Sequence, residues 1–96
     1  MTKADLVSDI SDKTGVERIA VQAAVEAFMD SIKLSLEKGE NVYLRGFGSF
    51  VVKERAEKTG RNISKNTTLI IPAHNIPSFK PSKPFIEGVK KKVKVN

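Results

Sequence analysis

Basic side chains gathered in one part of this 96-residue chain are the residues whose types and spacing can do chemistry. Residues 41–96 contain 12 Lys and Arg against three Glu, a net charge of +9, whereas residues 1–40 contain five against eight acidic residues, a net −3. Lys and Arg side chains bind phosphate groups and release condensed counterions from a polyanion. The basic half therefore predicts a polyanionic partner, and the alternative is a solvated basic surface.

The composition argues against most other chemistry. The chain has no Cys, which excludes a disulfide framework, a zinc finger and a cysteine nucleophile. Its one histidine, His74, has no cluster of partners for catalysis or metal binding, and the basic half has no paired carboxylates. We therefore predict that the chain is not an enzyme such as a nuclease or deaminase, and that it uses no metal, cofactor or small-molecule substrate.

The N-terminus and the hydropathy pattern predict where the protein works. The first five residues are polar and include an acidic side chain, unlike a signal peptide, and no apolar run approaches the length of a membrane span. We expect a cytoplasmic protein with no membrane partner.

Two helices are predicted to form a base from residues 1–40. Thr2 followed by Asp5 resembles a capping box for a helix over 3–13, and Gly15 suits its C-terminal end. A helix over about 18–38 is indicated by apolar residues three and four apart, namely Val21, Val25, Phe28, Ile32 and Leu36. A tight turn joins the helices into a hairpin, which we interpret as scaffold and not as a DNA-reading element.

After Gly39 apolar residues recur at every second position, and this alternation predicts β structure. Strands are expected around Val42 and Leu44, over 49–55 and over 67–71, with a glycine turn at 46–48. Residues 59–66 are interpreted as a polar turn region.

Prolines mark the remainder of the chain. Pro72 and Pro77 are five residues apart, so both cannot occupy outward positions of one regular strand. We expect a bulge or a change of pairing between them, around His74 and Asn75. A helix over about 85–94 is expected to begin with Pro84.

The apolar inventory predicts a dimer. If the ribbon over about 53–75 projects into solvent, the remaining residues bury too little surface to be stable alone. We expect two copies to share an aromatic and aliphatic core, formed by Phe28, Ile32, Phe47, Phe50 and Phe79. The alternative is a small monomer that uses these residues as a private core.

Several separated motifs resemble the bacterial HU / integration host factor family over residues 1 to about 90. They are Gly46-Phe47-Gly48-Ser49-Phe50, Lys53-Glu54-Arg55-Ala56, Thr59-Gly60-Arg61-Asn62 and Ile76-Pro77-Ser78-Phe79-Lys80-Pro81. The resemblance implies an α+β fold in which two chains intertwine and β-ribbon arms bend DNA through the minor groove, as this family is known to do. Residues 1–40 would form the helical base, 41–83 a three-stranded antiparallel sheet and arm, and 84–96 the C-terminal helix and tail.

The resemblance also implies DNA-binding residues. Arg61 and Asn62 match the arm tip that enters the minor groove, and Phe47, Phe50 and Phe79 match the shared core. The whole predicted set of DNA contacts is Lys3, Lys53, Arg55, Lys58, Arg61, Asn62, Ile63, Lys65, His74, Asn75, Lys80 and Lys83.

The arm tip departs from the family pattern. The family usually has Arg-Asn-Pro, and its proline is the wedge that kinks the duplex, whereas this chain has Ile63. Isoleucine is also a known wedge, so we expect Ile63 to insert between base pairs, with an ordinary turn residue as the alternative. His74 and Asn75 stand at positions that are often basic in the family.

We conclude from the sequence that the chain is a homodimeric, nucleoid-associated protein that bends, wraps and compacts double-stranded DNA with low sequence specificity. One alternative is a subunit of a sequence-preferring heterodimer like integration host factor. A second is an RNA-binding module, because phosphate contacts do not distinguish the two polymers.

Overall fold

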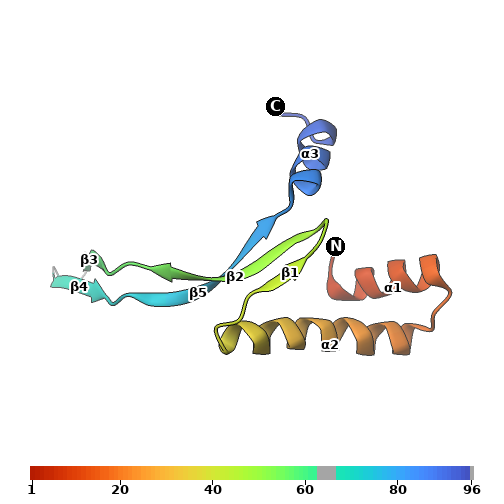
Figure 1. The fold of residues 1–96 in the computed structure, drawn as a ribbon, viewed down its shortest axis with the longest axis horizontal. Coiled ribbons are helices and arrows are strands. Elements are labelled where there is room, and N and C mark those ends of the chain that lie inside the picture. Colours follow the sequence, from red (N-terminus) through yellow and green to blue (C-terminus); the bar gives the residue numbers. More distant parts are fainter. Residues whose placement is uncertain (63–66, 96) are drawn as a thin grey trace. The chain divides into compact units, whose positions relative to one another are not determined.

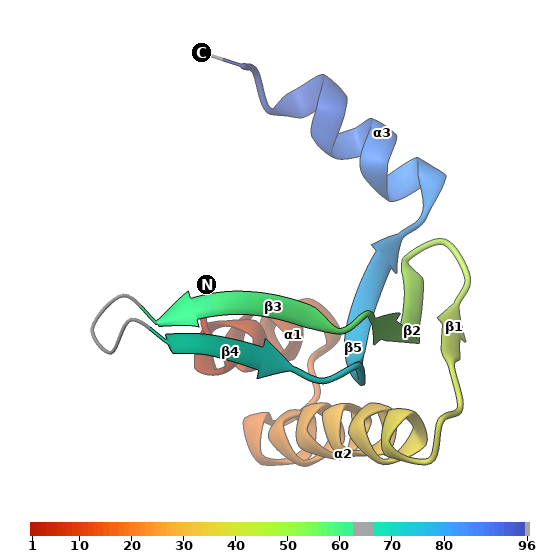
Figure 2. The same cartoon turned by 90° about the vertical axis from the view of Figure 1, so that its left-hand side faces the viewer.

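The computed structural model describes residues 1–62 and 67–95, and for Asn62 the backbone only. It divides into two compact units, Met1–Ser35 and Leu36–Asn96, which are described separately below. The elements appear in Figures 1 and 2 in chain order from red to blue. Among the described residues, none of the helices combines the length and the apolar character needed to cross a membrane.

The first unit is the predicted helical hairpin. Helix α1 (Lys3–Thr14) begins with a complete capping box, in which Asp5 N–H donates to Thr2 Oγ1 (3.3 Å) and Thr2 N–H donates to the Asp5 carboxylate (3.0 Å). It ends at Gly15, whose φ of 76° is the left-handed conformation that glycine adopts without steric cost. Helix α2 (Arg18–Glu37) follows after a short turn. Both sequence predictions are confirmed to within one residue at each end.

The second unit contains a three-stranded antiparallel sheet in the order β1–β2–β5. Strand β1 (Val42–Leu44) pairs with β2 (Gly48–Arg55), which pairs in turn with β5 (His74–Pro81). The predicted three-stranded antiparallel sheet is thus confirmed, and together with the helices it confirms the α+β fold class.

Beyond the sheet, the chain continues as a two-stranded ribbon, which we call the arm. It is formed by β3 (Lys58–Asn62) and β4 (Thr67–Ile71), paired from Lys58 with Ile71 to Asn62 with Thr67. The prediction of a turn over 59–66 is therefore wrong for residues 59–62, because pairing with β4 holds this polar segment extended. The predicted contacts Ile63 and Lys65 lie outside the described residues.

The paired segments β2–β5 and β3–β4, which we call the two ladders, are separated by a short unpaired stretch, and both have the same register. Arg55 pairs with His74 and Lys58 with Ile71, so two unpaired residues lie on each strand, at 56–57 and 72–73. The expected change of pairing around His74 and Asn75 is wrong: both residues are regularly paired, and the interruption on this strand lies at Pro72 and Ala73 with the register kept. The expected bulge is wrong, because neither strand carries an extra residue, and the segment from His74 onward is regularly paired.

The direction of the backbone groups explains why Pro77 is tolerated in β5. Val52 pairs with Pro77, and the Val52 N–H donates to the Asn41 side chain on the β1 side of the strand. Backbone groups of directly opposed residues in antiparallel strands point either toward or away from each other together. The missing N–H of Pro77 therefore faces away from β2, where no ladder bond is lost.

Helix α3 (Lys83–Lys92) is attached to the β1–β2 turn through its N-cap, Ser82. The Ser82 hydroxyl donates to the Gly46 carbonyl (2.9 Å) and accepts from Phe85 N–H (3.4 Å), and Ser82 N–H donates to the Phe47 carbonyl (2.9 Å). The helix begins one residue before the predicted Pro84, because serine supplies the capping oxygen and proline follows in the first turn.

Candidate nucleic-acid interface

The sheet has one polar, basic face. Tyr43 lies opposite Ser49, and Ser49 lies opposite Lys80, so these three side chains form a row across the strands on one face. Because side chains alternate along a strand, Lys53 and Arg55 lie on the face of Ser49. Their cross-strand partners, Ile76 and His74, lie on it as well. We call this surface the basic face; it unites the predicted contacts Lys53, Arg55, His74 and Lys80.

The opposite face is aromatic. Phe50 lies opposite Phe79, with ring centroids 4.9 Å apart, and Phe47 is 5.2 Å from Phe79. Phe85 of α3 stacks on Phe47 at 5.5 Å. The structure therefore brings together three of the predicted core residues with a fourth aromatic that the sequence prediction did not include. Asn75, paired with Glu54, lies on this face and not beside Lys53 and Arg55.

The arm presents polar groups on both of its faces. Lys58 and Ile71 lie on one face together with Thr67, by the alternation of side chains. Arg61 lies on the other face, opposite Thr68. A ribbon with hydrogen-bonding groups on both faces suits a groove, because the two walls of a groove face each other.

Most of the predicted cations are available to bind an anion. Within the described part of the chain, no ion pair is made by Lys53, Arg55, Lys58, Lys80 or Lys83. Lys3 is different, since its Nζ lies 2.9 Å from Glu26 Oε1 and both side chains are about half exposed. The hydrogen bond and charge of Lys3 lower the pKa of Glu26, which shows that this pair favours the ionised carboxylate.

His74 has a defined hydrogen bond on the basic face. Its Nδ1 lies 2.9 Å from the Pro72 carbonyl oxygen, which can only accept, so Nδ1 carries the proton. The second ring nitrogen, Nε2, is then an acceptor in the neutral ring and a donor only in the charged one. His74 can therefore donate to a phosphate through Nε2 only when the imidazole is protonated.

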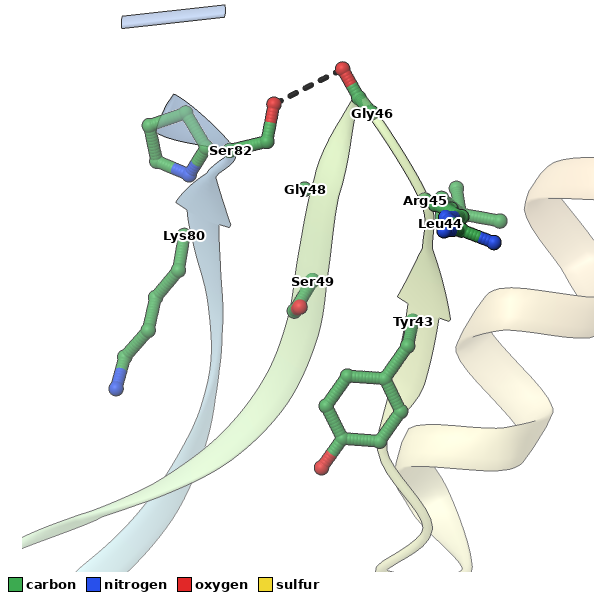
Figure 3. A pocket seen from close by; sticks show the side chains of 9 residues that line it. Tyr43, Leu44, Arg45, Gly46, Gly48, Ser49, Lys80 and Ser82 are labelled. Atoms are coloured by element: carbon green, nitrogen blue, oxygen red, sulfur yellow. Dashed lines mark hydrogen bonds between the residues drawn. The ribbon is translucent and has the colours of Figure 1, made fainter. Parts of the chain in front are cut away.

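An open hollow of about 430 Å³ lies at the end of the sheet next to the β1–β2 turn. Figure 3 shows Tyr43, Ser49 and Lys80 on three neighbouring strands and the Ser82 hydrogen bond to Gly46 above them. Tyr43 and Arg45 line this hollow, but sequence reasoning did not include either among the site residues. Their alternation with Val42 and Leu44 was the signal that could have placed Tyr43 on the exposed face of β1.

The described residues hold no group of three or more His, Cys, Asp or Glu side chains that could bind a metal ion. The chemistry available at the basic face and on the described part of the arm is therefore that of ammonium, guanidinium, imidazole and hydroxyl groups. These groups suit the binding of phosphate oxygens.

Comparison with known proteins gives a consistent result. Residues 1–90 match the family described as "Bacterial DNA-binding protein". "DNA-binding protein HU" of Geobacillus stearothermophilus is 40% identical over 90 residues, which cover 94% of this chain and all of that protein, and the HU protein of Staphylococcus aureus strain COL gives the same values.

Solved structures of the family also resemble the fold. An Anabaena HU–DNA cocrystal structure has a TM-score of 0.90 at 36% identity, covering 94% of this chain and 98% of that one. HU from Thermotoga maritima has a TM-score of 0.67 at 28% identity, covering 94% of this chain and all of that one. The chain belongs to the bacterial DNA-binding protein family and is a histone-like architectural DNA-binding protein, not a member of an enzyme family.

Proposed function

We propose that two copies of the chain form a homodimer that binds the minor groove of double-stranded DNA with low sequence specificity, bends and wraps it, and compacts the nucleoid. The single observation that carries this proposal is the division of the sheet into a basic and an aromatic face. One face supplies phosphate-binding groups that continue toward the arm, and the other supplies apolar surface for a second subunit.

The exposure of the apolar residues supports the homodimer. Only Val7 and Val21 are buried hydrophobic residues in the described part of the isolated chain. Phe28 is 50% exposed, Phe47 45% and Phe79 37%. Aromatic side chains bury large apolar areas in stable folds, and a chain with so small a core needs partner surface to be stable. A second copy is the simplest partner because most oligomers are symmetric.

The phosphate contacts account for affinity, and the arm for bending. Lys53, Arg55 and Lys80 on the basic face would neutralise backbone phosphates and release counterions. Arg61 and Asn62 would lie in the minor groove, which presents a nearly degenerate pattern of acceptors, so sequence preference would be weak. Insertion of Ile63 between base pairs would cost a few kcal/mol of unstacking, offset by the wrapped contacts.

The composition of the same site supports DNA binding without chemical modification of the DNA. A deaminase or nuclease needs a metal or a positioned acid and base, and the described residues hold no group of three or more His, Cys, Asp or Glu side chains that could bind a metal ion. We propose that the protein leaves DNA chemically intact. Incubation of supercoiled DNA with the protein and Mg²⁺ tests this, and nicked or linear product would contradict it.

The decisive experiment measures binding to intact, nicked and mismatched DNA duplexes and to an RNA duplex over a series of salt concentrations. We expect a steep linear fall of log affinity with log salt, and tighter binding to nicked or mismatched DNA, because a pre-weakened duplex bends at lower cost. Equal or tighter binding to the RNA duplex would instead favour an RNA-binding module.

Matched charge variants locate the site. Arg55→Gln removes a cation from the basic face. It should reduce the affinity for DNA and the salt slope, by which we mean the steepness of the fall of log affinity with log salt concentration. Lys33→Gln removes a cation from α2 in the other unit and should change both quantities less. Equal effects of the two substitutions would contradict a dedicated basic face. Sedimentation equilibrium of the purified chain tests the dimer, and a stable monomer, or assembly only with a different subunit, would contradict it.

A further inference from the structure

Asn41 connects the backbone of the sheet to the only tyrosine of the chain. The Val52 N–H donates to Asn41 Oδ1 at 3.0 Å, and Asn41 Nδ2 donates to Tyr43 Oη at 3.2 Å. Because a backbone N–H can only donate, the first bond fixes which end of the Asn41 amide is the oxygen. The NH₂ group is thereby directed to the tyrosine hydroxyl.

This arrangement determines what the hydroxyl can offer. A phenol has one O–H donor and acceptor lone pairs, and the bond from Asn41 occupies one of its acceptor positions. The O–H proton is left to donate to another group. Tyr43 is 71% exposed, so that group is water in the free protein or a ligand that approaches the basic face.

Tyr43 also stands in a row with two further donors. Its cross-strand neighbour is Ser49, whose own neighbour is Lys80, and directly opposed residues on adjacent strands have Cβ atoms roughly 5 Å apart. The row therefore combines two hydroxyl groups and one ammonium group over about 10 Å. It lies on the same face as Lys53 and Arg55 and borders the hollow beside the β1–β2 turn.

We propose that Tyr43, Ser49 and Lys80 form a subsite for a phosphate group of the bound DNA backbone, in which Tyr43 donates its hydroxyl proton to a phosphate oxygen and Asn41 positions the phenol. The proposal rests on the proposed DNA-binding function. It adds a neutral contact to the cationic ones, at a position that composition and charge do not single out.

The single tyrosine makes the subsite directly observable, because the chain has no Trp and one Tyr. Incorporation of 3-fluorotyrosine gives one ¹⁹F resonance, from Tyr43 alone. We expect this resonance to shift when an intact DNA duplex is added, in step with the fraction of protein bound. An unchanged resonance at saturation would overturn the proposal.

Affinity measurements provide the second readout. Tyr43→Phe keeps the ring and removes only the hydroxyl, and should weaken DNA binding about 2- to 10-fold without changing the salt slope, because the charge of the protein stays the same. Lys80→Gln should lower the salt slope by about 0.9 for each phosphate that the protein no longer neutralises. Ser8→Ala, which removes a hydroxyl from α1, is the control and should bind as the unaltered protein does. Wild-type affinity of Tyr43→Phe would overturn the subsite.

A double-mutant cycle tests the positioning role of Asn41. If Asn41 acts through Tyr43, then Asn41→Ala should reduce affinity in the unaltered protein and have little effect in the Tyr43→Phe variant; additive losses would remove the positioning role. Urea unfolding of each variant separates loss of affinity from loss of fold. If the unaltered protein does not bind duplex DNA, the proposed function fails; if it binds and Tyr43→Phe binds equally well, only the subsite fails.

Discussion

Replacing Gly48 by alanine should destabilise the sheet and displace Lys80, which lies at one end of the basic face. Gly48 is buried, and a Cβ added there would lie 2.5 Å from the Lys80 carbonyl oxygen and 2.7 Å from two ring atoms of Phe79. Carbon contacts are optimal at about 3.5–4.0 Å, so the shortfall is on the order of 1 Å. Neither neighbour can yield easily, because one is backbone of β5 and the other packs against Phe47 and Phe50.

The magnitude follows from what must give way. Overpacking of this kind costs about 1–3 kcal/mol, and if β5 retreats from β2, one ladder hydrogen bond worth about 1 kcal/mol is lost as well. We therefore expect Gly48→Ala to lower the free energy of unfolding by about 2–4 kcal/mol. Because Lys80 is the residue displaced, affinity for DNA should fall together with stability.

Urea unfolding followed by circular dichroism at one fixed protein concentration measures this loss, since the stability of an oligomer depends on concentration. Gly88→Ala is the matched control. A Cβ at Gly88 meets nothing within 4 Å, and alanine in a helix should instead stabilise α3 by about 0.5–1 kcal/mol. Wild-type stability of Gly48→Ala, or an equal loss in both variants, would refute the reasoning.

Three further predictions concern the caps and the ion pair. Ser82→Ala removes the α3 cap and the bond to the β1–β2 turn, and should lower the free energy of unfolding by about 1–2 kcal/mol in thermal melts, whereas Ser82→Asp should retain much of the cap. The Thr2 hydrogen bonds lower the pKa of Asp5, and Lys3 lowers the pKa of Glu26. Both ionised carboxylates therefore stabilise the fold at pH values above their ordinary pKa. This stabilisation is lost as the pH falls through the lowered pKa values of the folded protein. Acid titration by circular dichroism should show a shallower loss of stability for Asp5→Asn than for the unaltered protein, and parallel curves would contradict the capping role. Glu26→Gln frees the Lys3 ammonium to bind phosphate and should raise both the DNA affinity and the salt slope. Lys3→Gln should lower both quantities. If neither variant changes them, Lys3 does not contact DNA.

The helices were predictable because their signals are local. The reciprocal pair of Thr2 and Asp5 and the positive φ of Gly15 depend only on residues within one helix. The β3 strand was not predictable in this way, because Gly60 and Asn62 disfavour strands and only pairing with β4 holds them extended.

The alternation of residues along a strand could be read from the sequence, whereas the pairing between strands could not, and this difference explains what was predicted at the site and what was missed. The spacing of Pro72 and Pro77 predicted a bulge or a change of pairing around His74 and Asn75, whereas the structure leaves residues 72–73 unpaired and keeps the register. The sequence did not show that residues 56–57 are unpaired as well, which makes the interruption symmetric. In the same way, the neighbourhood of Tyr43, Ser49 and Lys80 depends on strand pairs far apart in sequence.

We expect the symmetric interruption between the two ladders to act as a hinge. A bend at residues 56–57 and 72–73 breaks no strand pair, whereas a bend within β3 and β4 would have to break ladder hydrogen bonds. Since both strands have the same number of residues across the hinge, the order of partners on its two sides is preserved however far it bends. We therefore expect the ribbon to bend more easily between the two described ladders than within either of them, so that an arm could follow duplexes of different curvature with the pairing of β3 and β4 intact.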